Sequence, residues 1–307
     1  MRGNDDVHLL KGKRMKPGAK KALLWIAAIL ISLGSMVYQR MTGPSYPKKY
    51  EFTLDGDTYS FSLPRSNQGV QSDFPVEIEL PEPFTASLIW RLYPTDQEWD
   101  TLVMKREDEL LKASLPLQPP AGKIEYHVEL MHDGQKMDLD EKFNVVIRFR
   151  GDVPAWALLP HVLMMVLTVI WSSAMILFVL AKLPYKRLMG TTIIFLFVGG
   201  FILGPIVQYY SFGQFWTGWP LGEDLTDNKV LAAMLAYLLA WFLRKKSYGR
   251  WLAIVAAMVM LAVYLIPHSM NGSELDPETG EVITGSILLL TTTIKFKQYD
   301  PNEALPV

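Results

Sequence analysis

Long apolar segments separated by short charged loops fill the second half of the chain. Residues 153–181 and 188–222 contain no Asp, Glu, Lys or Arg, and residues 251–273 are uncharged apart from His268. A membrane-spanning helix needs about 20 apolar residues, and a chain surrounded by lipid must satisfy its own backbone hydrogen bonds, as a helix does. The pattern therefore predicts three membrane-spanning helices in these segments.

Two shorter apolar runs complete the predicted membrane part. Residues 230–243 are too few to cross the bilayer, so this helix must begin near Thr226, which is also the expected N-cap. Residues 22–40 follow a basic tail (residues 1–21) and end without a small-x-small cleavage site, which favours an uncleaved signal-anchor helix. The expected fold class is a membrane α-helical protein with five transmembrane helices, four of which form a core over residues 153–273.

The distribution of charge predicts the orientation of these helices. Lys and Arg gather in the tail of residues 1–21 and in two short loops, residues 182–187 and 244–250. Because cytoplasmic loops are enriched in Lys and Arg, all three segments are expected inside the cell. The N-terminus is then cytoplasmic, while residues 45–151 and the C-terminal tail (residues 274–307) lie outside the cell membrane.

The extracytoplasmic insert, residues 45–151, alternates apolar and polar positions with a period of two. The clearest stretches are Tyr50–Leu54, Tyr59–Leu63, Val76–Leu80 and Phe143–Phe149. Turn residues separate such stretches at Asp55-Gly56 and at Asp133-Gly134. Short alternating strands joined by turns predict an inserted all-β sandwich domain.

One stretch of this insert carries a resemblance to known domains. Pro119-Pro120-Ala121-Gly122-Lys123-Ile124-Glu125-Tyr126-His127-Val128 resembles the tyrosine-corner region of immunoglobulin-like and fibronectin type III-like domains. In those domains a Gly-containing corner precedes a strand whose Tyr hydroxyl bonds back to the backbone. The resemblance implies an immunoglobulin-like sandwich with Tyr126 in that role, and it implies no activity.

Two segments on the outer side carry further expectations. Gly204-Pro205 is expected to kink or end the third helix. The aromatic residues 209–219 that follow are expected to form an interfacial belt or a lid over the polar residues described next. Residues 282–294 are apolar and rich in β-branched side chains but too few to span as a helix, so they predict a strand or hairpin on the outer face.

Four polar residues, one on each predicted core helix, lie at a similar depth: His161, Gln208, Asp227 and His268. At about 1.5 Å per helical residue, each lies about 25–31 Å from the nearest inner-side Lys or Arg. This depth is the outer edge of a hydrocarbon core about 30 Å thick. Ionisable groups at membrane depth are candidates for a functional site.

Imidazole and carboxylate groups together suit a divalent metal, which makes His161, Asp227 and His268 the candidate metal ligands. His161 and His268 are also the only histidines of the core, and so the only pair that could hold a b-type haem. The competing interpretation is that these residues are ordinary helix ends, with Asp227 solvated or paired with Lys229. No HxxxH or HExxH spacing strengthens the metal hypothesis.

Composition excludes several classes of function. The chain has a formal net charge of -1 and no cysteine among its 307 residues. The balanced charge argues against a nucleic-acid partner, and the lack of cysteine excludes disulfides, thiolate catalysis and Cys-ligated metals. The chain also contains no phosphate-binding loop, nucleophile elbow or dinucleotide motif.

Two classes of function stay open. The first is a binding or scaffold subunit in the lipid bilayer, whose β-sandwich recruits a protein partner of the cell envelope. The second is a membrane enzyme or redox protein that uses an outward-facing His/carboxylate site. A transporter is disfavoured because the chain has few helices, no repeated halves and no charge at the bilayer centre.

Overall fold

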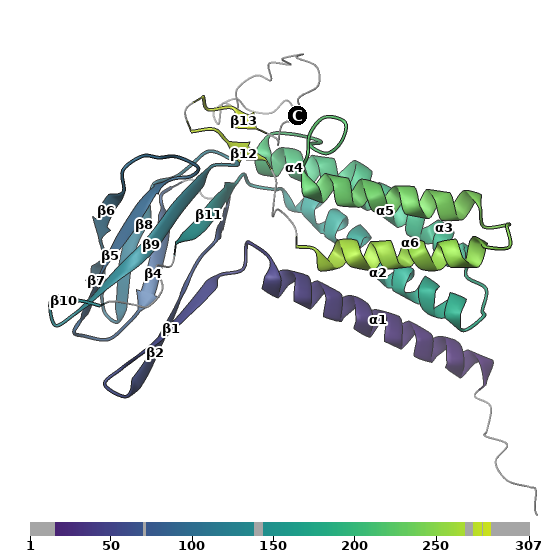
Figure 1. Cartoon of the computed structure of the whole chain (residues 1–307), viewed down its shortest axis with the longest axis horizontal. Coiled ribbons are helices and arrows are strands. Elements are labelled where there is room, and N and C mark those ends of the chain that lie inside the picture. Colours follow the sequence, from purple (N-terminus) through teal and green to yellow (C-terminus); the bar gives the residue numbers. More distant parts are fainter. Residues whose placement is uncertain (1–15, 70–71, 138–143, 268–272, 278, 284–307) are drawn as a thin grey trace, which may run out of the picture.

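The computed structural model describes residues 16–69, 72–137, 144–267, 273–277 and 279–283. Helix α1 (Pro17–Thr42) leads into a β-rich unit, and the remaining helices follow as a bundle (Figure 1). The β-rich unit lies at one end of the bundle, while α1 runs along its side (Figure 1).

The β-rich unit contains three groups of paired strands. The strands are β1 (Lys48–Leu54), β2 (Asp57–Leu63), β3 (Ser66–Gln68), β4 (Phe74–Glu79), β5 (Phe84–Leu92), β6 (Asp100–Val103), β7 (Lys105–Glu107), β8 (Leu110–Leu115), β9 (Lys123–His132), β10 (Gln135–Lys136) and β11 (Val145–Arg150). β1 and β2 form an antiparallel hairpin, and β4, β8 and β7 form a small sheet. The largest sheet has the order β3-β11-β9-β5-β6, with β10 beside β9 and with β3 parallel to β11.

Alternate side chains of these strands meet in one hydrophobic core. Val76 and Ile78 of β4, Leu88 of β5 and Ile147 of β11 are at most 1% exposed there. Residues two apart on a strand share a face, so the intervening polar residues point away from the core. The four stretches expected to alternate correspond to β1, β2, β4 and β11, although residue 143 lies outside the described residues. The β-rich unit is compatible with a sandwich.

The expected turns have the backbone geometry that hairpins require. Asp55 and Gly56, between β1 and β2, both have positive φ, 52° and 91°. Asp133 and Gly134, between β9 and β10, have φ of 51° and 74°. Two consecutive residues of positive φ make a type I′ turn, for which Asp-Gly is a preferred sequence.

Tyr126 ties β9 to the chain that follows β2. Its side chain is completely buried, and its hydroxyl donates a 2.5 Å hydrogen bond to the carbonyl of Pro64. The expected bond from this hydroxyl to the backbone is thus present. Its acceptor lies 62 residues earlier in the chain rather than in the adjacent corner of residues 119–122.

The bundle contains α2 (Ala155–Leu180), α3 (Lys186–Leu196), the π-helical segment η1 (Phe197–Leu203), α4 (Gly204–Phe212), α5 (Leu225–Phe242) and α6 (Gly249–Leu265). α3, η1 and α4 run on as one helix of 27 residues. Among the described residues, three helices are long and apolar enough to cross a membrane: α1, α2 and this continuous helix. α5 and α6 are shorter, with 18 and 17 residues.

The expected kink or end at Gly204-Pro205 takes another form, because the helix continues to Phe212. The N–H of Gly204 donates to the carbonyl of Gly199, five residues earlier, as in a π-helix. In a regular α-helix the ring of Pro205 would clash with the carbonyl four residues before it. The wider π turn gives that ring room.

Small residues and buried hydroxyls join the helices. An added Cβ on Gly199 would lie 2.9 Å from the Cβ of Met164 in α2, and one on Gly200 would lie 2.6 Å from Val230 in α5. These glycines therefore permit close helix contact. Across the bundle, the hydroxyl of Tyr237 donates a 2.6 Å bond to Ser172.

Candidate functional site

The N-terminus of α5 is held by Asp224. The Oδ1 atom of Asp224 accepts a 2.6 Å hydrogen bond from the backbone N–H of Thr226, and the helix begins at Leu225. The helix starts close to the expected position, but the expectation that Thr226 is the N-cap is wrong. A carboxylate caps a helix N-terminus as well as a hydroxyl does. The negative charge of Asp224 also interacts favourably with the positive end of the helix dipole.

Asp227, in the first turn of α5, is 7% exposed and is bound by the loop that precedes the helix. Its Oδ2 atom accepts hydrogen bonds from the backbone N–H of Thr217 (2.7 Å), the backbone N–H of Gly218 (3.1 Å) and the hydroxyl of Thr217 (3.2 Å). A Cβ on Gly218 would lie 2.6 Å from the Cβ of Asp227, so only glycine permits this approach. Among the described residues, the hydrogen-bond partners of Asp227 thus lie in the preceding loop, and Lys229 is not one of them.

The same loop joins Asp227 to Gln208. Nε2 of Gln208, in α4, donates a 2.5 Å hydrogen bond to the hydroxyl oxygen of Thr217. Gln208 and Asp227, two of the four residues expected at one depth, thus both form hydrogen bonds with the hydroxyl of Thr217. The backbone N–H of Trp219 also donates a 2.7 Å bond to Oδ1 of Asn228, which fixes the loop at a second point of α5.

Lys229 is 5% exposed and binds the end of α6. Its ammonium group donates 3.0 Å hydrogen bonds to the carbonyls of Ile266 and Pro267. The last carbonyls of a helix have no partner within the helix, and a lysine near that end satisfies them. Lys229 therefore acts as a clamp between α5 and the C-terminus of α6.

His161 lies in α2 beside the π-helical segment. Its Nδ1 atom is 2.9 Å from the carbonyl oxygen of Gly199. A carbonyl only accepts hydrogen bonds, so Nδ1 carries the proton in this contact. π-Helical turns inside longer helices are frequent at functional sites, which marks this region as a candidate in its own right.

The predicted metal site of His161, Asp227 and His268 stays a prediction, because His268 lies outside the described residues. The b-type haem hypothesis depends on the same histidine. Among the residues that the structure describes, no group of three or more His, Asp and Glu side chains is arranged to hold a metal ion.

A second polar cluster joins the β-rich unit to the end of α4 and to the C-terminal segment that begins at Ser273, and we call it the junction. At its centre the guanidinium of Arg148, on β11, packs 4.0 Å from the ring centre of Phe212 and donates to the carbonyl of Ser273. Burial lowers the pKa of Arg148 from its ordinary value to about 10, while the carboxylates of Asp224 and Glu274 act in the opposite direction. A cation so strongly desolvated is a structural anchor rather than a surface charge.

Three more contacts complete the junction. Lys123 forms an ion pair with Glu274, and burial lowers the pKa of this lysine. The backbone N–H of Leu275 donates a 3.2 Å bond to the carbonyl of Ala121. The backbone N–H of Gly151 donates a 3.0 Å bond to the carbonyl of Ser211, at the end of α4.

The C-terminal side of the junction is a small hairpin, β12 (Glu274–Leu275) and β13 (Val282–Ile283). The turn between these strands was expected, and so was a strand at the start of residues 282–294; residues 284–294 lie outside the described part. Gln214 binds the hairpin twice, by a 3.3 Å bond to the carbonyl of Val282 and a 3.2 Å bond from the hydroxyl of Ser273. Sequence reasoning missed these partners because they depend on the path of two loops.

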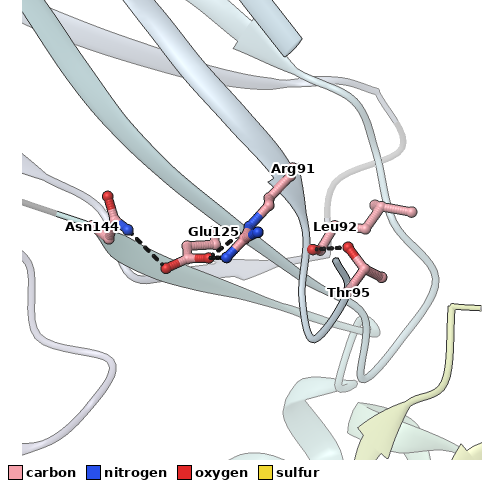
Figure 2. A network of polar contacts seen from close by, with 5 residues as sticks. All are labelled: Arg91, Leu92, Thr95, Glu125 and Asn144. Carbon is pink, nitrogen blue, oxygen red and sulfur yellow. Dashed lines mark hydrogen bonds and ion pairs between the residues drawn. The ribbon is translucent and has the colours of Figure 1, made fainter. Parts of the chain in front are cut away.

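The outward face of the largest sheet carries a third polar cluster (Figure 2). Arg91 donates to Oε2 of Glu125 from Nε (3.0 Å) and lies 2.8 Å from it through Nη2, while Asn144 donates to Oε1 (3.0 Å). The guanidinium of Arg91 also stacks 4.4 Å from the ring centre of Trp99. These contacts fix the long side chains on a face that points away from the core.

Comparison with known proteins adds no relative to these observations: no protein-family model matches the chain, and no curated protein or solved structure matches it significantly.

Proposed function

We propose that the chain is a multi-pass protein of the cell membrane that acts as a binding or scaffold subunit. In this proposal five helices span the bilayer with the N-terminus in the cytoplasm, and α1 serves as an uncleaved signal anchor. An immunoglobulin-like sandwich on the extracytoplasmic side recruits a protein partner of the cell envelope. Three helices long and apolar enough to cross a membrane support the membrane part.

The lengths of α5 and α6 are compatible with two further spans. At about 1.5 Å per residue they measure about 27 Å and 26 Å, close to a hydrocarbon core about 30 Å thick. Lys229 joins their outer ends through its bond to the carbonyl of Ile266. Asp227, at the start of α5, binds the loop between α4 and α5. Both features agree with helices that end at the membrane surface.

The observation that carries the proposal is the junction. A tether alone would suffice for a domain that only needs to stay near the membrane. Here Gly151, Lys123 and Arg148 bind two different segments, the end of α4 at Ser211 and the C-terminal segment at Ser273 and Glu274. Such contacts hold the β-rich unit in one orientation, which is useful when one of its faces must meet a partner.

The outward face of the largest sheet is the surface that we assign to the partner. Val103, on β6, is 75% exposed and lies opposite Ser87, and Met131, on β9, is also exposed. Farther along the same face, Arg91 pairs with Glu125 (Figure 2) and stacks on Trp99. Exposed apolar side chains on the same face as preordered Arg and Trp side chains are typical of protein interfaces.

Photo-crosslinking in intact cells tests this assignment. A photoreactive amino acid at Val103 or Met131 should give one discrete protein adduct, and the same group at Lys246, on the opposite end of the bundle, should not. Absence of adducts from both positions, together with stoichiometric metal or a haem spectrum in the purified protein, would instead support the alternative of a membrane enzyme or redox protein.

A further inference from the structure

The loop between α4 and α5, residues 213–224, turns back along the bundle after α4 ends. The ring of Phe215 stacks on that of Tyr209 in α4, with 4.3 Å between the ring centres and 11° between the ring planes. The hydrogen bond from Gln208 to the hydroxyl of Thr217 holds the next part of the loop beside the same turn of α4. The loop therefore lies beside the last turns of α4 rather than beyond the end of that helix.

Trp216 reaches further back, to the π-helical segment. Its ring stacks on that of Phe201, with 5.5 Å between the ring centres, and Phe201 stacks in turn on Phe197. At about 1.5 Å per residue, Phe201 lies about 16 Å before the end of α4 at Phe212. Phe197 is exposed, so these stacked rings join the loop to the outer surface of the continuous helix formed by α3, η1 and α4.

The backbone of residues 217–222 finds protein acceptors for all of its N–H groups. The acceptors are the side chains of Asp227 and Asn228 and the carbonyl of Gly218. The donors, in chain order, are the N–H groups of Thr217, Gly218, Trp219, Leu221 and Gly222. Pro220, the remaining residue, has no N–H. Lipid offers no acceptor, so a non-helical segment at membrane depth needs acceptors from the protein, as these residues have.

Three apolar side chains of the same loop nevertheless point out of the protein. Phe215, Trp219 and Leu221 are between 55% and 71% exposed. Exposed aromatic and aliphatic side chains on a segment with bonded N–H groups suit the boundary between lipid headgroups and acyl chains, where Trp is enriched.

We propose that the loop is an anchor in the outer leaflet of the bilayer, with Phe215, Trp219 and Leu221 inserted about 5–10 Å into the boundary between headgroups and acyl chains. In the membrane orientation proposed above, on which this anchor depends, the outer end of α4 lies at that leaflet. Glu223, exposed and charged, lies where the chain returns to water. The anchor also fixes the depth of Gln214, which binds the hairpin of the junction, and so orients the β-rich unit relative to the membrane surface.

The test is depth-dependent fluorescence quenching on the full-length protein in vesicles of dioleoyl phosphatidylcholine. Because the chain has no cysteine, a thiol-reactive nitrobenzoxadiazole fluorophore can be attached at Trp219→Cys or, in a second variant, at Leu221→Cys. Both side chains are exposed, and Trp219 contributes backbone atoms to the bonds of the loop, so these bonds are kept. Lipids that carry a nitroxide near the glycerol end or near the methyl end of an acyl chain quench a fluorophore that lies close to them in the bilayer.

Two further positions serve as matched controls. Val103→Cys replaces an exposed apolar residue of the β-rich unit, and no partner protein is present in the vesicles to cover it. Ile194→Cys replaces an exposed apolar residue of α3, in one of the helices long and apolar enough to cross a membrane. The proposal predicts that labels at Trp219 and Leu221 lose fluorescence with the nitroxide near the glycerol end and emit at shorter wavelength than the label at Val103.

The controls separate failure of the anchor from failure of the proposed function. Quenching at Ile194 together with loop labels that behave like the label at Val103 would overturn the anchor, leave the membrane proposal standing, and make the exposed side chains of the loop a surface for a protein. Loss of quenching at Ile194 as well would overturn the proposed membrane orientation and the anchor with it.

Discussion

The Oδ2 atom of Asp227 lies 2.7 Å from the backbone nitrogen of Thr217, ten residues earlier in the chain. Two more donors, the Thr217 hydroxyl and the Gly218 N–H, converge on the same oxygen. A buried carboxylate with three donors organises the loop between α4 and α5. The loop in turn carries Gln214, which binds the C-terminal hairpin at the junction.

Asp227→Ala is expected to destabilise the protein strongly. The substitution leaves three donors without an acceptor, and hydrogen bonds to a charged group contribute about 1.5–3 kcal/mol each in mutational series. We expect a loss of at least about 2 kcal/mol in the free energy of unfolding, measured by denaturation in mixed micelles. Glu223→Ala, which removes an exposed carboxylate four residues earlier, should change stability by less than about 0.5 kcal/mol. A loss equal to that control would contradict the role assigned to Asp227.

The depth argument from the sequence brought Gln208 and Asp227 to one level, and the structure connects them through Thr217. It could not identify Thr217 itself, because a loop partner depends on the path of the backbone rather than on helical rise. For the same reason the sequence left Lys229 as one possible partner of Asp227, whereas the lysine binds the carbonyls of Ile266 and Pro267. Equal depth on two helices does not fix the direction in which each side chain points.

Tyr126→Phe removes the hydroxyl that binds Pro64 and leaves a buried carbonyl without this donor. The expected loss is about 1 kcal/mol, the usual net contribution of one hydrogen bond. Tyr59→Phe is a suitable control, because Tyr59 is partly exposed on the β1–β2 hairpin and should cost less than about 0.5 kcal/mol. Comparable losses for both variants, in chemical denaturation of the β-rich unit, would show that the Pro64 contact contributes nothing specific.

The same residue makes stability depend on pH. Burial holds the pKa of Tyr126 well above its ordinary value of 10.0, with a smaller contribution from Tyr50. The folded state therefore keeps the phenol proton at a pH where the unfolded state loses it, so this contribution is present below pH 10.0 and is lost as the pH rises above it. The stability difference between the wild type and Tyr126→Phe should be constant from about pH 7 to 9 and about 1.4 kcal/mol smaller at pH 11. A constant difference through pH 11 would contradict the prediction.

The strands were predictable where one face meets the core and the other meets solvent. The alternation at residues 50–54 and 59–63 corresponds to β1 and β2, and the Asp-Gly turn between them has the required positive φ. β5 shows why the alternation of apolar and polar residues did not predict the other strands. Ile89 follows Leu88 directly and lies on the outward face opposite His127, so three apolar residues in a row hide the alternation.

Gly151→Ala is expected to loosen the junction. An added Cβ would lie 2.2 Å from the carbonyl oxygen of Tyr210, a backbone atom that cannot rotate away, so the end of β11 must move from α4. Limited proteolysis should then cut the connection between β11 and α2 at least several-fold faster than in the wild type. Gly34→Ala, where nothing lies within 4 Å of the added atom, should leave the rate unchanged. Equal rates for both variants would mean that this contact does not hold the two parts together.

The central claim is that the β-rich unit and the α4–α5 loop lie outside the cell while the α2–α3 and α5–α6 loops lie inside. Because the chain has no cysteine, single cysteines can be labelled in intact cells with a membrane-impermeant maleimide. The account predicts that Lys105→Cys and Glu223→Cys react in intact cells, and that Lys186→Cys and Lys246→Cys react only after lysis. Labelling of Lys186→Cys in intact cells would contradict the five-helix arrangement.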